Sequence, residues 1–279
     1  MHKDTPSSIG KRVRLSRVLK GGRGVIFAFD HGFEHGPSDF SEESLDPREV
    51  VGRAVEAGFD AIMMNKGIAE ATADLWTGRV PLILKMTGKT SLKPKELQFS
   101  QYGISSVDDA IALAADGVAG TVYWGAPEEE AMASSFSRVI ARCDDLGMPS
   151  MILAYPRGPA IRDSSDPDVV AYVARASSEL GVDIIKTHYT GSVESFRRVV
   201  RAATVPVMLS GGVKAEDPRQ FFEVVAAVLE AGGAGVVVGR NVFQSPRFVG
   251  MGAALKGMVH GNLSPGEAEK VLQSGSSGR

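Results

Sequence analysis

The chain has 279 residues, 43% of them hydrophobic, and its 31 lysines and arginines nearly balance 33 aspartates and glutamates. This length and apolar content suffice for one large core, and the balanced charge excludes a strongly basic surface for nucleic acid or an anionic membrane. The single cysteine, Cys143, excludes an internal disulfide framework and fits a reducing compartment. We therefore expect one cytoplasmic domain that acts on a small molecule.

The two ends of the chain differ in character from the part between them. Residues 1–24 are polar and basic and lack the apolar core of a targeting sequence, so we expect an N-terminal arm or helix that covers the bottom of a barrel. No uncharged apolar run approaches the ~20 residues that a membrane helix needs, and we expect no membrane contact. Residues 263–279 predict a C-terminal helix and, from Gln273, a disordered tail rich in Gly and Ser.

Eight short apolar runs predict eight strands. Four of them follow a glycine that closes a helix-like stretch, at Gly58, Gly117, Gly181 and Gly232, where we expect the left-handed backbone conformation. Three others begin with or follow a proline, which can start a strand but cannot occupy its middle. The predicted strands are residues 25–30, 60–65, 81–85, 120–124, 150–155, 184–187, 206–210 and 235–239.

The segments between these runs have amphipathic helical spacing, with Asp, Ser or Pro near their starts. The clearest of them are residues 47–57, 106–115, 166–180 and 217–230. Alternating strands and helices predict an α/β protein, and eight strands favour a closed (β/α)₈ barrel over an open doubly wound sheet. No G-x-G-x-x-G motif follows the first strand, which argues against a dinucleotide site. We predict a single-domain barrel over residues 25–262.

The loops after the seventh and eighth predicted strands carry glycines at the end where barrel enzymes have their active sites. They contain Ser210, Gly211 and Gly212 in one loop, and Gly239 and Arg240 in the other. Glycines let backbone N–H groups approach an anion, and the guanidinium group of an arginine adds positive charge and paired N–H donors. The two loops predict a phosphate cup, although glycines that only make tight turns would give the same pattern.

Lys186 ends the sixth predicted strand, and alternation places it on the same face as Ile184. If that face is the lumen, desolvation and a nearby arginine both disfavour the protonated amine, which can then attack a carbonyl. The alternative is a lysine that only pairs with a carboxylate. Lys85, on the third predicted strand, is the rival nucleophile, and we rank it second because Lys89 close by also suits anion binding.

Two further strand ends carry groups that could move protons. Tyr155 ends the fifth predicted strand, and its phenol beside a cationic amine is easier to ionise. Asp30 ends the first predicted strand and could hold the lysine or shuttle a proton. Neither residue alone indicates catalysis, since a tyrosine at a strand end often serves only in packing. Both residues are expected at the same end of the barrel.

Residues 31–35 match H-x-x-E-H, an inverted zinc-protease motif. That chemistry needs both histidines on one helical face, whereas Gly32, Gly36 and Pro37 predict a loop here. We therefore expect no metal, and we assign His35 to a phosphate or hydroxyl of the substrate. His188 could face inward by strand alternation, so it remains a possible third ligand.

Six strand-end sequences carry a family resemblance. They are Phe-Asp-His-Gly-Phe-Glu-His-Gly-Pro from Phe29, Leu-Ile-Leu-Lys-Met-Thr-Gly-Lys-Thr from Leu82, Tyr-Pro-Arg-Gly from Tyr155, Lys-Thr-His-Tyr-Thr-Gly from Lys186, Ser-Gly-Gly from Ser210 and Val-Gly-Arg-Asn-Val-Phe-Gln from Val238. Over residues 24–260 the chain resembles the archaeal-type class I fructose-bisphosphate aldolases. The resemblance implies a barrel that cleaves fructose 1,6-bisphosphate to dihydroxyacetone phosphate and glyceraldehyde 3-phosphate without a metal or other cofactor.

The resemblance also assigns residue roles. It places the Schiff-base lysine at Lys186, the catalytic tyrosine at Tyr155 and the aspartate of the first strand at Asp30. Substrate contacts are expected at His31, His35, Lys85, Arg157, Ser210, Gly211, Gly212, Gly239 and Arg240, with the last five at the ketose 1-phosphate and with His35 and Arg157 near the far phosphate. It suggests a homo-oligomer, with a decamer of two rings as one form.

Some positions depart from this pattern. Leu153 stands where we expect an aromatic residue, two positions before Tyr155. Residues 11–17 and 185–191 also resemble a sister group, the 2-amino-3,7-dideoxy-D-threo-hept-6-ulosonate synthases. That group tends to have Ser-Asn in place of Glu34-His35 and lacks the lysine at Lys85, so we favour the aldolase. A related transaldol or acyl transferase, and a phosphate-binding isomerase or silent sugar-phosphate binder with a structural Lys186, remain alternatives.

Overall fold

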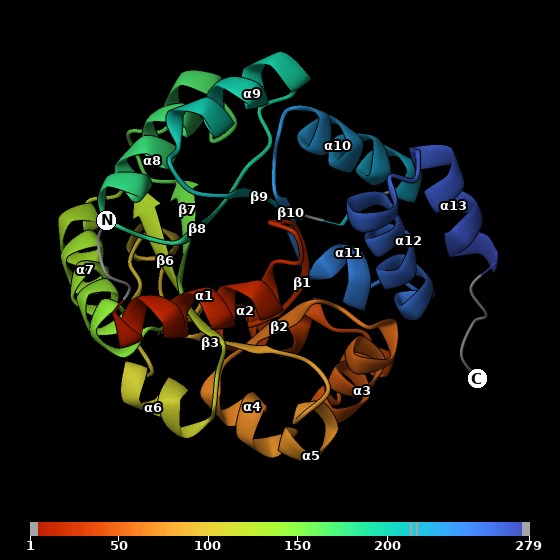
Figure 1. Cartoon of the computed structure of the whole chain (residues 1–279). Helices are drawn as coiled ribbons and strands as arrows, with labels where there is room; N and C mark the ends of the chain where they lie inside the picture. Colours follow the sequence, from red (N-terminus) through yellow and green to blue (C-terminus); the bar gives the residue numbers. More distant parts are fainter. Residues whose placement is uncertain (1–4, 213, 216, 275–279) are drawn as a thin grey trace.

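The structure is a computed structural model that describes residues 5–212, 214–215 and 217–274. Eight parallel strands close into a barrel in the order β1-β10-β9-β8-β7-β6-β3-β2, and helices surround it (Figure 1). The barrel strands are β1 (Gly24–Phe29), β2 (Ala61–Met64), β3 (Leu82–Lys85), β6 (Gly117–Trp124), β7 (Ser150–Pro156), β8 (Ile184–Thr187), β9 (Val207–Ser210) and β10 (Gly235–Val238). The predicted single-domain (β/α)₈ barrel is confirmed.

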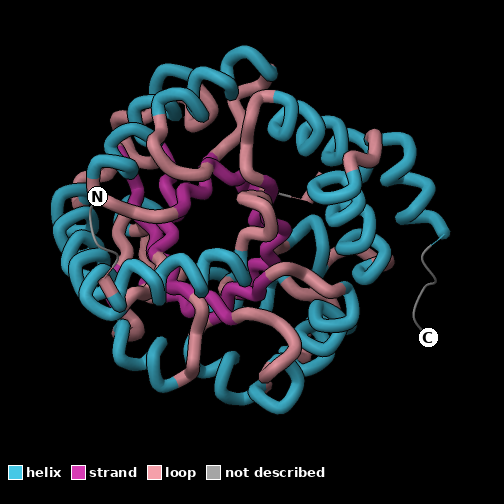
Figure 2. The backbone as a smooth tube through the Cα atoms, in the orientation of Figure 1, coloured by secondary structure: helices cyan, strands magenta, loops and turns pink. Residues whose placement is uncertain are grey.

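Helices surround the barrel (Figure 2), and most of them follow a strand, whereas α1 precedes β1. They are α1 (Pro6–Val18), α2 (His31–His35), α3 (Pro47–Ala57), α4 (Lys66–Ala71), α5 (Ala73–Trp76), α6 (Val107–Ala112), α7 (Glu129–Leu146), α8 (Pro167–Glu179), α9 (Val193–Ala202), α10 (Pro218–Glu230), α11 (Arg240–Phe243), α12 (Phe248–Gly261) and α13 (Pro265–Ser274). A small antiparallel pair, β4 (Thr87–Gly88) and β5 (Tyr102–Gly103), lies outside the barrel sheet. No helix among the described residues is long and apolar enough to cross a membrane.

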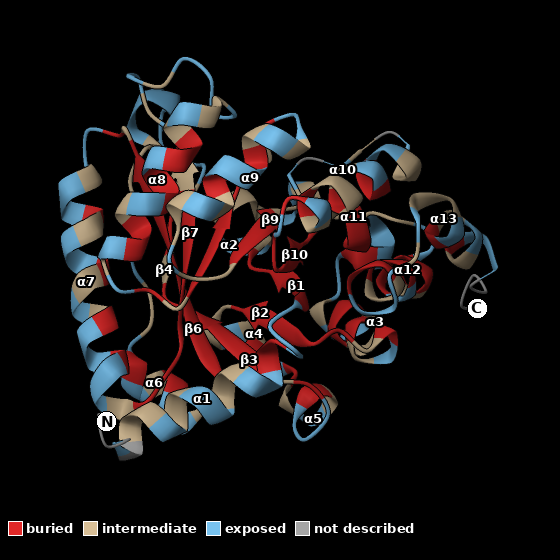
Figure 3. Cartoon of the chain, turned by 45° about the horizontal axis from the view of Figure 1, so that its top comes forward, coloured by how far each residue is buried: buried red, intermediate tan, exposed pale blue. Residues whose placement is uncertain are grey.

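Alternation along each strand divides the apolar residues between two clusters. One cluster fills the barrel interior with side chains such as Ile26, Met63 and Ile184, while the other packs between the strands and the helices. The buried strands and the exposed outer helix faces are visible in Figure 3. The interior cluster therefore fills the barrel. Polar side chains that face inward at the carboxyl end of a strand lie at the corresponding end of the lumen.

The predicted helix ends are correct at three of the four glycines. Gly58, Gly181 and Gly232 have φ values of 66°, 91° and 94°. The prediction at Gly117 is wrong, because Ala114 takes the left-handed conformation with φ 51° and α6 already ends at Ala112. The strand β6 consequently begins at Gly117, three residues before the predicted start.

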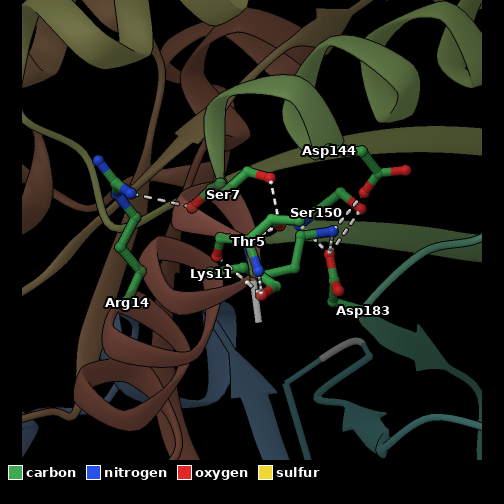
Figure 4. A network of polar contacts seen from close by, with 9 residues as sticks. Thr5, Ser7, Lys11, Arg14, Asp144, Ser150 and Asp183 are labelled. Carbon is green, nitrogen blue, oxygen red and sulfur yellow. Dashed lines mark hydrogen bonds and ion pairs between the residues drawn. The ribbon is translucent and has the colours of Figure 1, made fainter. Parts of the chain in front are cut away.

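Helix α1 lies against the opposite, amino-terminal end of the barrel strands. Its Lys11 pairs with Asp144 and with Asp183, which immediately precedes β8 (Figure 4). Val18 and Leu19, at the end of α1, are buried in the interior cluster. Polar and apolar contacts together hold α1 across the bottom of the barrel and leave the carboxyl end as the open one.

The prediction of a disordered tail from Gln273 is wrong for its first two residues. Gln273 and Ser274 belong to α13, and residues 275–279 lie outside the described part of the chain.

Candidate active site

A cavity of about 310 Å³ opens at the carboxyl end of the barrel. Eleven of the twelve predicted site residues line it: Asp30, His31, His35, Tyr155, Arg157, Lys186, Ser210, Gly211, Gly212, Gly239 and Arg240. The exception is Lys85, which lies behind Asp30. Sequence reasoning did not assign a substrate contact to several other lining residues, namely Glu34, Thr121, Tyr123, Leu153, Pro156, Ser164, His188 and Val237.

Lys186 points into the lumen. Ile184 belongs to the interior cluster and Ile185 to the outer one, so alternation along β8 directs Lys186 inward. The residue is only 6% exposed, and Asp30 is the carboxylate close enough to sense its charge. A lysine in this position can reach a carbonyl group in the cavity.

Lys85 is buried in an ion pair. Its Nζ lies 3.1 Å from Oδ2 of Asp30 and 3.8 Å from Oε1 of Glu34, and the residue is 1% exposed. Burial alone would lower the pKa of Lys85, but the two carboxylates outweigh burial and hold it above its usual value. The amine of Lys85 therefore stays protonated, and this favours Lys186 as the nucleophile.

The ion pair with Lys85 also keeps Asp30 ionised. Burial would raise its pKa, yet the charge of Lys85, helped by that of Lys186, holds the pKa of Asp30 well below its usual range. A fixed negative charge thus faces the amine of Lys186 without being able to donate a proton at neutral pH.

Residues 31–35 form the one-turn helix α2, so the predicted loop is wrong. The glycine that suggested a loop instead ends the helix: Gly36 has φ 66°, and its N–H donates to the carbonyl of Gly32. The rings of His31 and His35 lie 6.4 Å apart on this turn. Burial, with Lys186 and Arg240 nearby, lowers the pKa of His31 to about 4, so its imidazole is neutral.

The loops after β9 and β10, where the sequence predicts a phosphate cup, both line the cavity. A side chain at Gly239 would collide with the ring of His31 at 2.3 Å, so this glycine permits the close approach of α2 to the loop after β10. The side chain of Asn241 donates to the carbonyl of Gly211 at 2.6 Å and so ties the two loops together. Nε of Arg240 is buried without a hydrogen-bond partner among the described residues, which leaves a donor free for an anionic ligand.

Tyr155 lines the cavity near the end of β7. Its hydroxyl is 3.3 Å from Oγ of Ser210, and its ring stacks on that of His188, with centroids 4.9 Å apart. The hydroxyl therefore points toward the glycine loop that follows β9.

Sequence reasoning missed a network of polar side chains that borders the cavity. The amide of Gln101 donates to Glu34 at 2.9 Å and to the hydroxyl of Tyr123 at 2.8 Å, and the guanidinium of Arg157 lies 4.9 Å from the centroid of the Tyr123 ring. The strand-end rule could have found Tyr123, which comes next to last in β6. Gln101 belongs to the connection between β4 and β5 and carries no local signal.

Comparisons with known proteins relate the chain to aldolases. The sequence model of one family, described as DeoC/LacD family aldolase, matches residues 24–245. The chain is 40% identical over 253 residues to a class 1 fructose-bisphosphate aldolase of Thermoproteus tenax, covering 90% of this chain and 94% of that protein. It is 35% identical over 265 residues to 2-amino-3,7-dideoxy-D-threo-hept-6-ulosonate synthase 1 of Archaeoglobus fulgidus, covering 95% of each.

A solved structure is similar over nearly the whole barrel. An archaeal fructose-1,6-bisphosphate aldolase, described with its catalytic Lys covalently bound to the carbinolamine intermediate of the substrate, superposes with a TM-score of 0.83 at 37% identity. The match covers 89% of this chain and 99% of that one.

Proposed function

The chain belongs to the DeoC/LacD aldolase family, and we propose that it is a class I fructose-bisphosphate aldolase. It cleaves fructose 1,6-bisphosphate to dihydroxyacetone phosphate and glyceraldehyde 3-phosphate, and it catalyses the reverse condensation, as glycolysis or gluconeogenesis requires. The observation that carries the proposal is the buried, inward-facing Lys186 beside a glycine-lined anion cup. The archaeal relative described with a lysine-bound carbinolamine supports the same chemistry.

In the proposed cycle the amine of Lys186 adds to the ketone carbon, and loss of water gives an iminium ion. The iminium accepts the electron pair of the breaking carbon–carbon bond, so the hydroxyl beside that bond becomes an aldehyde as it loses its proton. Tyr155 moves protons to and from the enamine that remains. Asp30, ionised by its pairing with Lys85, stabilises the positive charge of the iminium.

The cavity offers hydrogen-bond donors and positive charge for both phosphates. The backbone N–H groups of the loops at Gly211 and Gly239 and the free donor of Arg240 suit the 1-phosphate. Arg157 and His35, which also line the cavity, suit the second phosphate. The substrate would then lie across the lumen with its carbonyl group near Lys186.

The synthase of the sister group is the second candidate, and the relative at 35% identity favours it. The pair formed by Glu34 and Lys85 argues for the aldolase, because the sister group is expected to lack both residues and the structure places them 3.8 Å apart in one buried network. Replacing Lys85 would remove the cation that pairs with both Glu34 and Asp30.

The test is a product screen by mass spectrometry. The purified protein would be incubated with dihydroxyacetone phosphate and a set of aldehydes, and separately with fructose 1,6-bisphosphate. Formation of fructose 1,6-bisphosphate from glyceraldehyde 3-phosphate, together with its cleavage, supports the aldolase. Turnover only with another ketose and acceptor would favour the synthase.

We further propose a cytoplasmic homo-oligomer, with a decamer of two rings as the form that the family resemblance suggests. Sedimentation of a monomer in analytical ultracentrifugation would contradict this assembly.

A further inference from the structure

His188 is a histidine in the cavity wall that the proposed cycle does not use. It follows β8 directly and lies at the boundary between two hollows, the active-site cavity and an adjoining groove lined by Tyr189, Phe221 and Val224. Its ring faces that of Tyr155 with centroids 4.9 Å apart and an interplanar angle of 27°. The imidazole therefore separates the phenol from the adjoining groove.

The register of the two strands fixes this stack. Leu153 of β7 pairs with Lys186 of β8, and the next residue, Thr187, donates its hydroxyl to the carbonyl of Ala154 at 2.9 Å. One position further in this register, Tyr155 of β7 and His188, the residue after β8, come side by side. The stack is thus a consequence of the same pairing that aims Lys186 into the lumen.

The electrostatics of the pocket keep this ring neutral. Burial, with the charges of Lys186 and Arg157, lowers the pKa of His188 to about 4. At neutral pH the ring therefore offers a flat, uncharged face to the phenol, and it adds no cation beside the amine that must form an imine.

The position of the phenol matters because, among the described residues, its hydroxyl has a single polar contact, with Oγ of Ser210 at 3.3 Å. This contact is long for a bond between two hydroxyls and cannot by itself fix the ring. Leu153, which occupies the place of an expected aromatic residue, provides no flat surface either. The ring of His188 is the flat surface that the structure supplies.

On the basis of the proposed aldolase function, we propose that His188 is a positioning residue, whose stacked ring holds Tyr155 in the orientation that transfers protons to and from the enamine. His188 itself does not exchange protons with the substrate. The stack limits the phenol to the rotamer in which its hydroxyl faces the glycine loop after β9, and reactions before proton transfer do not depend on it.

The test compares two substitutions of similar volume. His188→Phe keeps a flat ring and removes both nitrogens, whereas His188→Leu fills the space without a ring face. We expect His188→Leu to lower kcat for cleavage by about tenfold or more, since a mispositioned acid or base loses much of its contribution. His188→Phe should retain kcat within about threefold of the wild type, and KM should change little in both variants.

Trapping with dihydroxyacetone phosphate and borohydride provides the second readout, because imine formation on Lys186 precedes the step assigned to Tyr155. Both variants should be labelled as fully as the wild type, which also shows that their sites are folded. Wild-type kcat in His188→Leu, equal losses in the two variants, or lost labelling in His188→Leu would each overturn the positioning role. Absence of labelling in the wild type would instead contradict the aldolase mechanism itself.

Discussion

Nζ of Lys85 lies 3.1 Å from Oδ2 of Asp30, behind the wall of the active-site cavity. The pairing assigns separate tasks to the two lysines of the site. Lys85 is held as an ammonium by two carboxylates, while Lys186 faces the cavity and has no ion pair with a carboxylate among the described residues. One lysine thus fixes the charge of Asp30, and the other is available to a carbonyl group.

Replacing Lys85 by Met should destabilise the fold more than most single substitutions. The change leaves Asp30 and Glu34 buried without their cation, and breaking a buried ion pair from one side typically costs about 3–5 kcal/mol. The free energy of unfolding in urea measures the loss. The double variant Lys85→Met/Asp30→Asn is the control, and its loss should be smaller than the sum of the two single losses. Strict additivity would show that the two residues do not interact.

Replacing Arg240 by Ala should weaken binding of dihydroxyacetone phosphate by about 2–5 kcal/mol, the range for removing one partner of a buried charge pair. Isothermal titration of the Lys186→Met protein, which binds without forming an imine, isolates this contribution. Arg247, at the amino end of α12 and outside the cavity lining, is the matched control position. Equal affinity in the Arg240 variant and its parent would move the phosphate elsewhere.

Cys143 should not react with thiol reagents in the folded protein. The residue is 0% exposed, and burial raises the pKa of its thiol to about 12, so almost no thiolate forms at pH 8. We expect no colour from a disulfide reagent in native buffer and one equivalent per chain in guanidinium. One rapid equivalent in native buffer would show that α7 opens readily.

The barrel was predictable because strand alternation and helix ends are local properties. Alternation placed Lys186 on the same face as Ile184, and the structure shows that this face is the lumen, since Ile184 lies in the interior cluster and Ile185 in the outer one. Ala114 escaped prediction because a non-glycine residue in the left-handed conformation is uncommon and leaves no compositional signal.

The charge network behind the site was not predictable from local patterns. Glu34 meets Lys85 only because α2 forms a turn after β1, and the glycines of that turn indicated a loop. Gln101, on the connection between β4 and β5, reaches Glu34 across 67 positions of the chain. Such contacts depend on how loops fold over the barrel rather than on any strand or helix pattern.

Activity should persist after metal removal, because the lysine route needs no ion, whereas the alternative aldolase chemistry uses Zn²⁺ to polarise the carbonyl group. The enzyme would be dialysed against a strong chelator, checked for zinc by elemental analysis and assayed for cleavage. The helical turn places His31 and His35 near one another, and two neighbouring histidines could both bind Zn²⁺, so the two mechanisms predict different outcomes. Activity that disappears on chelation and returns with Zn²⁺ would contradict the imine mechanism.

The most direct measurement is reductive trapping of the imine on Lys186. Dihydroxyacetone phosphate and borohydride should add one substrate-derived mass to the wild-type chain, and peptide mapping should locate it at Lys186. The variant Lys186→Met, which removes the amine at similar volume, should fold normally by circular dichroism, gain no mass and lose turnover. A label on Lys85, or a Lys186→Met protein that keeps activity within about tenfold of the wild type, would contradict the mechanism.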